Sequence, residues 1–330
     1  MTELGVHSIG EFVLAVPALT EAEHFYKSFG LVVTSEGNHL ALRAAEGDRR
    51  WGRVIEAKSK FLHHITFHCF EDDLVRFKSR LETSSVRLLD APREFASDGL
   101  WFRGHDGILM EIRVGPKTSP DKLWVPKPPC YEAGVRNAPY RLLAENIHIR
   151  RFSHMLLFTT DIDRAIDFYS NVLGLRLADR TADAIAFLYA IHGSDHHMVA
   201  FAKSDRPGLH HTSWEVPSID EVGLGAMRMA DQGYRRSWGT GRHVLGSNYF
   251  HYIRDPWGSW CEYTCGIDFI PACTPWTAGD HPLEDGLYLW GPDLPPDFVL
   301  NFEGAPPETL GASLANEMSG ALILDRKSVV

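Results

Sequence analysis

Apolar and polar residues along this chain follow two alternating patterns. Short apolar runs such as Phe12 to Leu19 predict buried strands. The segment 154–175 begins with another such run and continues with apolar residues at helical spacing, which predicts a strand followed by a helix. Thr160 or Asp161 can cap that helix, and Gly174 can end it. The chain is therefore expected to have the α+β fold class.

These patterns occur more than once. Three pairs of segments correspond: 11–31 with 154–175, 62–71 with 209–218, and 101–112 with 252–263. The first pair reads EFVLAVPALTEAEHFYKSFGL and HMLLFTTDIDRAIDFYSNVLGL, so each copy has a strand, a helix with Phe-Tyr, and Gly-Leu. The repeats predict four βαβββ modules of about 50–60 residues, paired into two half-barrel-like domains.

The prolines indicate where the domains end. Five of them lie within Gly115–Pro129, and a proline-rich stretch is typical of a connector rather than of a central strand. The expected division is an N-terminal, non-catalytic two-module domain at 1–130 and a catalytic two-module domain at 145–270. The rest, 271–330, is expected to be an extension that packs on the surface near the mouth of the site.

The repeats also allow the residues at matching positions of the two halves to be compared. Fifteen residues before Tyr169 lies His154, whereas fifteen residues before Tyr26 lies Glu11. Four further positions compare as follows, with the N-terminal residue first: His64 with His211, Glu111 with Glu262, Trp101 with Tyr252, and Pro92 with His243. The N-terminal half is therefore expected to keep the fold without binding a catalytic metal.

His154, His211 and Glu262 are the candidate metal ligands. Two imidazoles and one carboxylate on one face of a metal ion leave the opposite face open for substrate and O2. Glu262 lies in an apolar strand, where an unpaired carboxylate is costly. His211 is preferred to its neighbour His210 because His211 and His154 occupy matching positions in their modules.

Composition and charge exclude some classes of binding partner. The 330 residues have a net charge of −10, which argues against nucleic acid or an anionic membrane surface. No apolar run is long enough to span a membrane. The cysteines form an odd, sparse set without Cys-x-x-Cys spacing, which suggests reduced thiols and a cytoplasmic location. They are Cys69, Cys130, Cys261, Cys265 and Cys273.

The run GRHVLGSNYFHYIRDPWGSWCEY at 241–263 resembles the signature of type I extradiol ring-cleavage dioxygenases, in the vicinal oxygen chelate superfamily. One position departs from the signature, because His251 stands where an apolar residue usually precedes the tyrosine. The matching residues are Gly241, His243, Tyr252, Asp255, Pro256, Gly258 and Glu262.

The resemblance implies that His154, His211 and Glu262 bind Fe(II), or Mn(II) in a minority of relatives. It also implies that His197 is the acid/base, with His196 as the competing residue. His243 and Tyr252 would contact the diol oxygens. The implied partners are O2 and a catechol, and a homo-oligomer is expected.

Two other functions stay open on sequence alone. One is another metal enzyme on the same modules, such as a glyoxalase-type isomerase or a keto-acid dioxygenase. The other is a small-molecule-binding protein, although such members of the superfamily lack the full metal triad.

Overall fold

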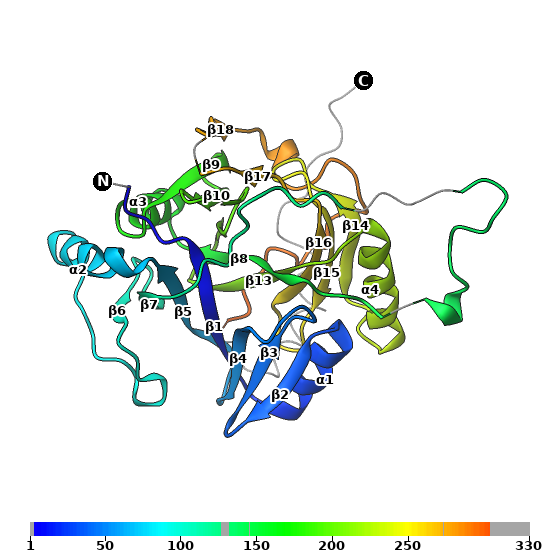
Figure 1. The fold of residues 1–330 in the computed structure, drawn as a ribbon, viewed down its shortest axis with the longest axis horizontal. Helices are drawn as coiled ribbons and strands as arrows, with labels where there is room; N and C mark the ends of the chain where they lie inside the picture. The colour runs from blue at the N-terminus through cyan, green and yellow to red at the C-terminus, as the bar shows by residue number, and fades with distance from the viewer. Residues whose placement is uncertain (1–2, 127–131, 145, 273, 304–330) are drawn as a thin grey trace.

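The computed structural model describes residues 3–126, 132–144, 146–272 and 274–303 (Figure 1). The first half of the chain forms a seven-stranded mixed sheet in the order β2-β3-β4-β1-β5-β7-β6. Its strands are β1 (Ser8–Val16), β2 (Val32–Glu36), β3 (His39–Arg43), β4 (Arg50–Glu56), β5 (Phe61–Cys69), β6 (Leu100–Arg103) and β7 (Leu109–Val114).

The second half forms a nine-stranded sheet in the order β14-β15-β16-β13-β8-β12-β10-β9-β18. Its strands are β8 (Arg151–Thr159), β9 (Leu175–Thr181), β10 (Ile185–Ala190), β12 (Val199–Lys203), β13 (Gly208–Glu215), β14 (Ser237–Arg242), β15 (Tyr249–Arg254), β16 (Trp260–Cys265) and β18 (Gly279–Asp280). A separate pair consists of β11 (Ser194–Asp195) and β17 (Phe269–Ile270).

The two sheets confirm the internal repeat. Read from β9 to β15, the second sheet has the same order as the first from β2 to β6. The pairings agree as well, because β1 is parallel to β4 and antiparallel to β5, and β8 is parallel to β12 and antiparallel to β13. The fold is α+β, as the pattern of apolar residues predicts.

The helices lie outside the sheets (Figure 1). They are α1 (Leu19–Phe29), α2 (Leu74–Thr83), α3 (Ile162–Asn171) and α4 (Ile219–Asp231), with short 3-10 turns η1 (Glu71–Asp73), η2 (Arg93–Phe95), η3 (Arg141–Leu143) and η4 (Leu283–Asp285). Asp161 caps α3 by accepting a hydrogen bond from the backbone N–H of Arg164. None of the helices in the part of the chain that the structure describes has the length and apolar character needed to cross a bilayer.

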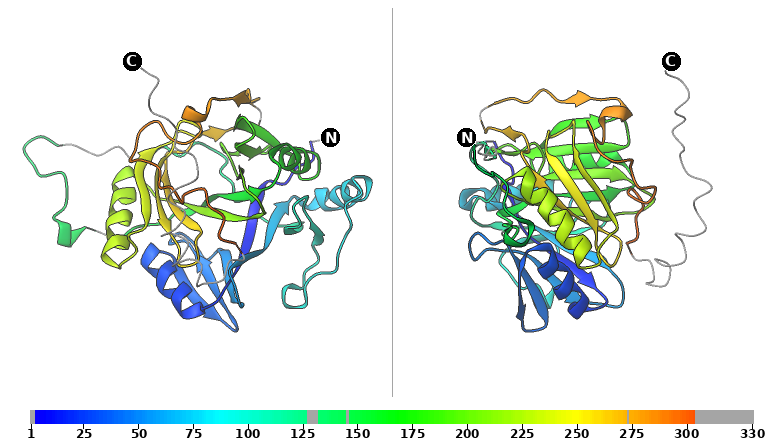
Figure 2. Two further views of the ribbon diagram at one scale, coloured as in Figure 1. Left: turned by 180° about the vertical axis from the view of Figure 1, so that it is seen from behind. Right: turned by 90° about the vertical axis from the view of Figure 1, so that its right-hand side faces the viewer.

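The two halves share one hydrophobic core. Phe29 of α1 stacks on Tyr263 of β16 with ring centroids 4.0 Å apart, and the Tyr263 hydroxyl donates to the Phe29 carbonyl at 2.7 Å. Phe12 of β1 contacts Phe152 and Trp214 of the second sheet. Figure 2 shows the two halves against each other in both views. The first half therefore supports the sheet that holds the site.

The described part of the extension packs on the second sheet, and Leu287 and Phe298 reach the lining of the cavity described below. β18 adds to the β9 edge, and the backbone of Trp290 bridges to Arg242 at the end of β14. Pairing of this kind satisfies the polar groups of an edge strand. Cys130, Cys273 and residues 304–330 lie outside the described residues, and the other three cysteines are free and buried.

Candidate metal centre and active site

Three neighbouring strands bring the candidate ligands together. His154 lies on β8, His211 on β13 and Glu262 on β16, and one ligand atom from each lies within 4.8 Å of the others. Glu262 Oε2 is 3.1 Å from His154 Nε2 and 3.6 Å from His211 Nε2. The register explains the convergence, because His154 and Glu262 are both paired with Ser213 of β13.

The chemistry of this cluster fits a metal ion. His211 Nε2 and Glu262 Oε2 are buried and have no hydrogen-bond partner. Such atoms are expensive to leave unpaired, whereas both are lone-pair donors that a divalent metal would satisfy. Burial alone would raise the pKa of Glu262, but the adjacent His154 and His243 lower it well below its usual range, so the carboxylate is ionised.

A second layer of residues orients His154. Its Nδ1 lies 3.1 Å from the Ser153 hydroxyl, which in turn donates to Asp195 Oδ2 at 2.8 Å. Arg151 holds Asp195 through two hydrogen bonds of 2.8 and 2.9 Å. Because the Ser153 hydroxyl donates to the carboxylate, its oxygen accepts from His154 Nδ1, and His154 Nε2 keeps the lone pair for a metal.

His211 is oriented by its neighbour. A bulge in β13 between Leu209 and His211 places His210 beside His211, with 2.8 Å between their Nδ1 atoms. His210 Nε2 donates to the Phe298 carbonyl at 2.8 Å. A carbonyl can only accept, so His210 Nδ1 is left to accept from His211 Nδ1, and His211 Nε2 keeps its lone pair. His210 therefore orients His211 through the contact between their Nδ1 atoms.

Asn248 orients the carboxylate. Its Nδ2 donates to Glu262 Oε1 at 3.1 Å and to Thr264 Oγ1 at 2.7 Å. These bonds satisfy Oε1 and leave Oε2 toward the two histidines. The sequence gives no strong signal for this role, because an asparagine after Gly-Ser is most simply a turn residue.

The candidate acid/base lies beside the cluster. The ring of His197 is 4.1 Å from that of His154, and the residue is only 4% exposed. Desolvation lowers the pKa of His197 well below its ordinary value, and the nearby His154 and His196 lower it further. His197 is therefore a neutral base at pH 7. His196, the competing candidate, donates from Nε2 to Asp179 and does not line the cavity.

His243 and Tyr252 face the same space. His243 Nε2 lies 3.0 Å from the Tyr252 hydroxyl and 3.8 Å from Glu262 Oε1. The other ring nitrogen of His243 donates to the carbonyl of Leu287 in the extension. Burial raises the pKa of Tyr252 well above its usual range, so its hydroxyl stays protonated and able to donate.

A cavity links these groups. Its polar lining consists of two proposed ligands, His154 and His211, and of His197, His210, His243, Asn248 and Tyr252. The rest is mainly apolar and comes from Leu156, Ile185, Phe187, Ala202, Leu245, Leu287, Phe298 and Val299. Among the described residues that line it, none is arginine or lysine. Arg242, next to His243, donates from Nε to the Ser247 carbonyl and covers the Tyr249 ring.

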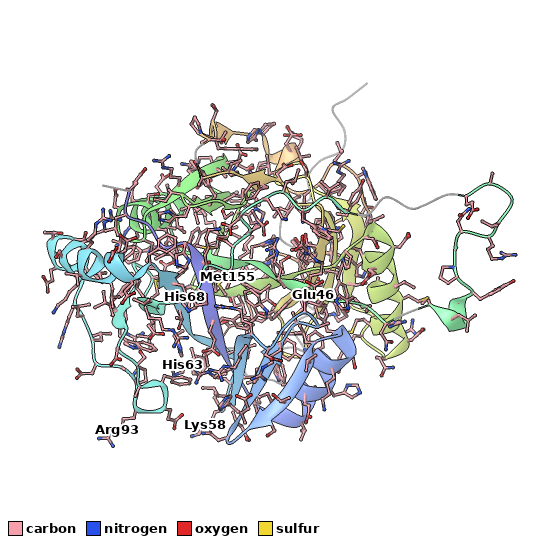
Figure 3. All side chains as sticks on the ribbon, in the orientation of Figure 1. Glu46, Lys58, His63, His68, Arg93 and Met155 are labelled. Carbon is pink, nitrogen blue, oxygen red and sulfur yellow. The ribbon has the colours of Figure 1, made fainter. Side chains whose placement is uncertain are left out.

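The matching positions of the N-terminal half are engaged in other contacts. Glu11 is ion-paired with Arg50 and Arg53. His64 packs against Trp101, and Glu111 accepts hydrogen bonds from Thr66 and Ser97. The strand register pairs Trp101 with Glu111 as it pairs Tyr252 with Glu262, which confirms the alignment of the repeats. Two further histidines of β5, His63 and His68, also lie in this half (Figure 3).

Known proteins are similar to this chain in sequence and in fold. Residues 151–263 match the Glyoxalase/Bleomycin resistance protein/Dioxygenase superfamily. Metapyrocatechase 2 of Cupriavidus necator is 47% identical over 298 residues, which cover 90% of this chain and 93% of that protein. An iron-dependent extradiol dioxygenase of Rhodococcus jostii is 33% identical over 154 residues, covering 43% of this chain and 50% of that one.

Among solved structures, 2,2',3-trihydroxybiphenyl 1,2-dioxygenase from Sphingomonas wittichii has the same fold. Its TM-score is 0.70 at 22% identity, with 88% of this chain and 100% of that chain covered. The near full-length match to metapyrocatechase 2 and the His-His-carboxylate cluster lead to one family. The chain belongs to the metal-dependent extradiol ring-cleavage dioxygenases of the vicinal oxygen chelate superfamily.

Proposed function

We propose that this protein opens the ring of a catechol next to the diol, inserts both atoms of O2, and forms a hydroxymuconic-semialdehyde-type product. One observation supports this most strongly. Two unpaired ligand atoms, His211 Nε2 and Glu262 Oε2, lie buried 3.6 Å apart, and His211 lines a cavity together with His197, His243 and Tyr252. The site thus offers metal ligands, a neutral base and hydrogen-bonding groups for a diol.

We infer that the ligands are His154, His211 and Glu262 and that the metal is Fe(II). Two neutral imidazoles and a carboxylate suit Fe(II), and relatives named for iron and for manganese both exist. When bound, the metal supplies a Lewis acid that lowers the pKa of a diol hydroxyl and a redox centre that reacts with O2.

The protein side chains handle the protons. His197 is neutral, so it can take the proton of a diol hydroxyl and later return it to an oxygen, a contribution typically worth about 10²–10⁴-fold. The Tyr252 hydroxyl and His243 Nε2, 3.0 Å apart, can both hydrogen-bond a substrate oxygen. The apolar wall holds the ring and excludes water.

The lining of the cavity also indicates the substrate class. A carboxylated diol would need a buried cation beside the ring, and the lining contains neither arginine nor lysine among the described residues. We therefore propose an uncharged catechol.

The internal repeats and the proline-rich connector support the proposed domains 1–130, 145–270 and 271–330. In this division the N-terminal domain supports the catalytic one and is not itself catalytic. Three buried free thiols favour a cytoplasmic location, and a homo-oligomer stays a prediction.

Anaerobic loading with Fe(II), followed by a panel of catechols and O2, tests the proposal. The expected result is O2 consumption with a yellow ring-opened product from uncharged catechols. Glu262→Gln should abolish it, because the amide replaces a charged metal ligand. A loaded protein that leaves every catechol intact would refute ring cleavage. Isomerisation of a glyoxalase-type substrate without O2 consumption would assign the alternative activity.

A further inference from the structure

A second polar cluster lies behind His197, away from the proposed metal ligands. Its centre is Asp179 on β9, which is only 6% exposed. Four N–H groups donate to this carboxylate. They are His196 Nε2 at 2.8 Å, His281 Nε2 at 2.7 Å, the backbone N–H of Gly279 at 2.9 Å and Trp276 Nε1 at 3.3 Å.

The extension builds most of this cluster. Trp276, Gly279 and His281 all come from the segment that adds β18 to the edge of the sheet, where Gly279 pairs with Asp179. Burial alone would raise the pKa of Asp179, but the donors from His196, His281 and Gly279 lower it overall. The carboxylate is therefore ionised and can only accept hydrogen bonds.

The ionised Asp179 carboxylate determines which nitrogen of His196 has the hydrogen. Because Asp179 only accepts, His196 Nε2 must have its hydrogen, and in the neutral ring Nδ1 then has a lone pair. His196 Nδ1 lies 3.1 Å from His197 Nδ1. Two ring nitrogens at that distance form a hydrogen bond only if one of them has a hydrogen, and here it must be His197.

We propose that Asp179, acting through His196, fixes His197 in the tautomer with hydrogen on Nδ1 and a lone pair on Nε2. Asp179 and His196 are then positioning residues, and the second nitrogen of His197 is the one that accepts a substrate proton. His210 and His211 show the same arrangement, with the Phe298 carbonyl in the place of Asp179. In both pairs, an oxygen that can only accept hydrogen bonds fixes the tautomer of one histidine (His196 or His210), which in turn fixes the tautomer of the next (His197 or His211).

Asp179→Asn is the direct test. Oδ1 accepts from His281 at 2.7 Å and from the backbone N–H of Gly279 at 2.9 Å, whereas Oδ2 accepts from His196 at 2.8 Å and only distantly, at 3.3 Å, from Trp276. The amide should therefore keep its oxygen at the Oδ1 position and place its NH2 toward His196. His196 Nε2 would then accept, its Nδ1 would donate to His197 Nδ1, and the hydrogen of His197 would move to Nε2. An aspartate that orients a histidine in a catalytic triad shows the same effect when replaced by asparagine.

Ring-¹⁵N histidine NMR of the full chain, loaded with diamagnetic Zn(II), reads the tautomer directly. The His197 signal is assigned by its loss in His197→Gln. The expected result is Nδ1–H in the wild type and Nε2–H in Asp179→Asn. Asp183→Asn is the matched control, since that carboxylate is exposed on the adjacent turn and pairs with Lys203.

Kinetics of the Fe(II) enzyme give a second readout, which rests on the proposed function. In Asp179→Asn, kcat for catechol should fall by about 10²-fold while KM stays within about threefold, because general-base catalysis is lost and the apolar pocket is unchanged. If Asp179→Asn does not fold, His196→Leu tests the same link, since it removes the acceptor of His197 Nδ1 while Asp179 keeps its donors from His281 and Gly279.

The outcomes separate the two proposals. A wild-type His197 with its hydrogen on Nε2, or an Nδ1–H that persists in both variants, would overturn this inference even if catechol is cleaved. The expected tautomers in a chain that cleaves no catechol would support the positioning device and remove the proposed function.

Discussion

Asn248→Ala isolates the second layer of the metal centre. The side chain of Asn248 is buried, donates to Glu262 Oε1 and Thr264 Oγ1, and touches neither histidine ligand in the contacts that the structure gives. Its removal frees the Glu262 carboxylate to turn while leaving all three proposed ligands in the chain. The change should therefore weaken metal binding rather than abolish it.

The magnitude follows from these contacts. A hydrogen bond to a charged group contributes about 1.5–3 kcal/mol and one to a hydroxyl about 1 kcal/mol. Alanine also removes Asn248 Oδ1, which is buried without a partner and costs about 1–3 kcal/mol in the wild type. These effects nearly cancel in the free energy of unfolding of the metal-free chain. Metal affinity should still fall about 10–100-fold, as for other residues that orient a ligand.

Anaerobic competition for Fe(II) against a chromophoric chelator measures that affinity, and chemical unfolding of the metal-free chain measures stability. Asn137→Ala is the matched control, because that asparagine bonds only to backbone groups of an exposed loop among the described residues. An Asn248→Ala affinity within twofold of wild type would refute the orienting role. If Asn248→Ala lowered the free energy of unfolding of the metal-free chain by several kcal/mol, the lost hydrogen bonds and the removal of the unpaired Oδ1 would not cancel, and that part of the reasoning would be wrong.

Three further outcomes are expected. His197→Phe should bind Fe(II) and catechol in titrations yet lower kcat by about 10²–10⁴-fold, and wild-type turnover would move the acid/base role to His196. Fe(II) at a hundred times its Kd should stabilise the folded chain by about 2.7 kcal/mol and raise Tm, whereas in Glu262→Ala the melting curve should not respond. Burial lowers the pKa of His64 to about 3, so between the unfolded value near 6.5 and pH 3 the unfolded chain binds more protons and stability falls as pH falls. Other buried histidines with a lowered pKa, such as His7 and His68, add to the same loss. Urea unfolding at pH 7.5 and 5.5 should therefore show a loss that is about 1 kcal/mol smaller in His64→Leu than in the wild type, and an equal loss in both chains would contradict this assignment.

Much of the candidate site could be predicted because the two halves of the chain repeat the same pattern and their matching positions can be compared. The repeat gives His154, His211 and Glu262 defined module positions, and the strand register brings them together, because His154 and Glu262 both lie opposite Ser213, two residues from His211. Strand alternation sends matching positions to the same face of a sheet, so a repeated pattern predicts which side chains converge. The same register pairs Tyr252 with Glu262, as their spacing indicates.

The supporting layer could not be predicted in this way. The links from Asp195 to Ser153 and from Asp179 to His196 join residues outside the three pairs of segments whose sequences correspond. Nor does any sequence pattern show that the Phe298 carbonyl would accept a hydrogen bond from His210. Every residue has a backbone carbonyl, so the sequence does not show which one accepts a hydrogen bond from a side chain. In the same way, the residue type does not show whether an aspartate faces solvent or accepts hydrogen bonds from four N–H groups.

The amino-acid sequence by itself indicated the α+β class, the duplicated modules and His154, His211 and Glu262 as a candidate cluster, because period and spacing are properties of a linear chain. Only the tertiary structure decided the protonation geometry around them. The tautomers of His197 and His211 depend on acceptors that are 18 and 87 residues away, Asp179 and Phe298, and on how β18 and the extension close over the second sheet. Hydrogen bonds act over about 3 Å in space, so distance along the chain does not limit them.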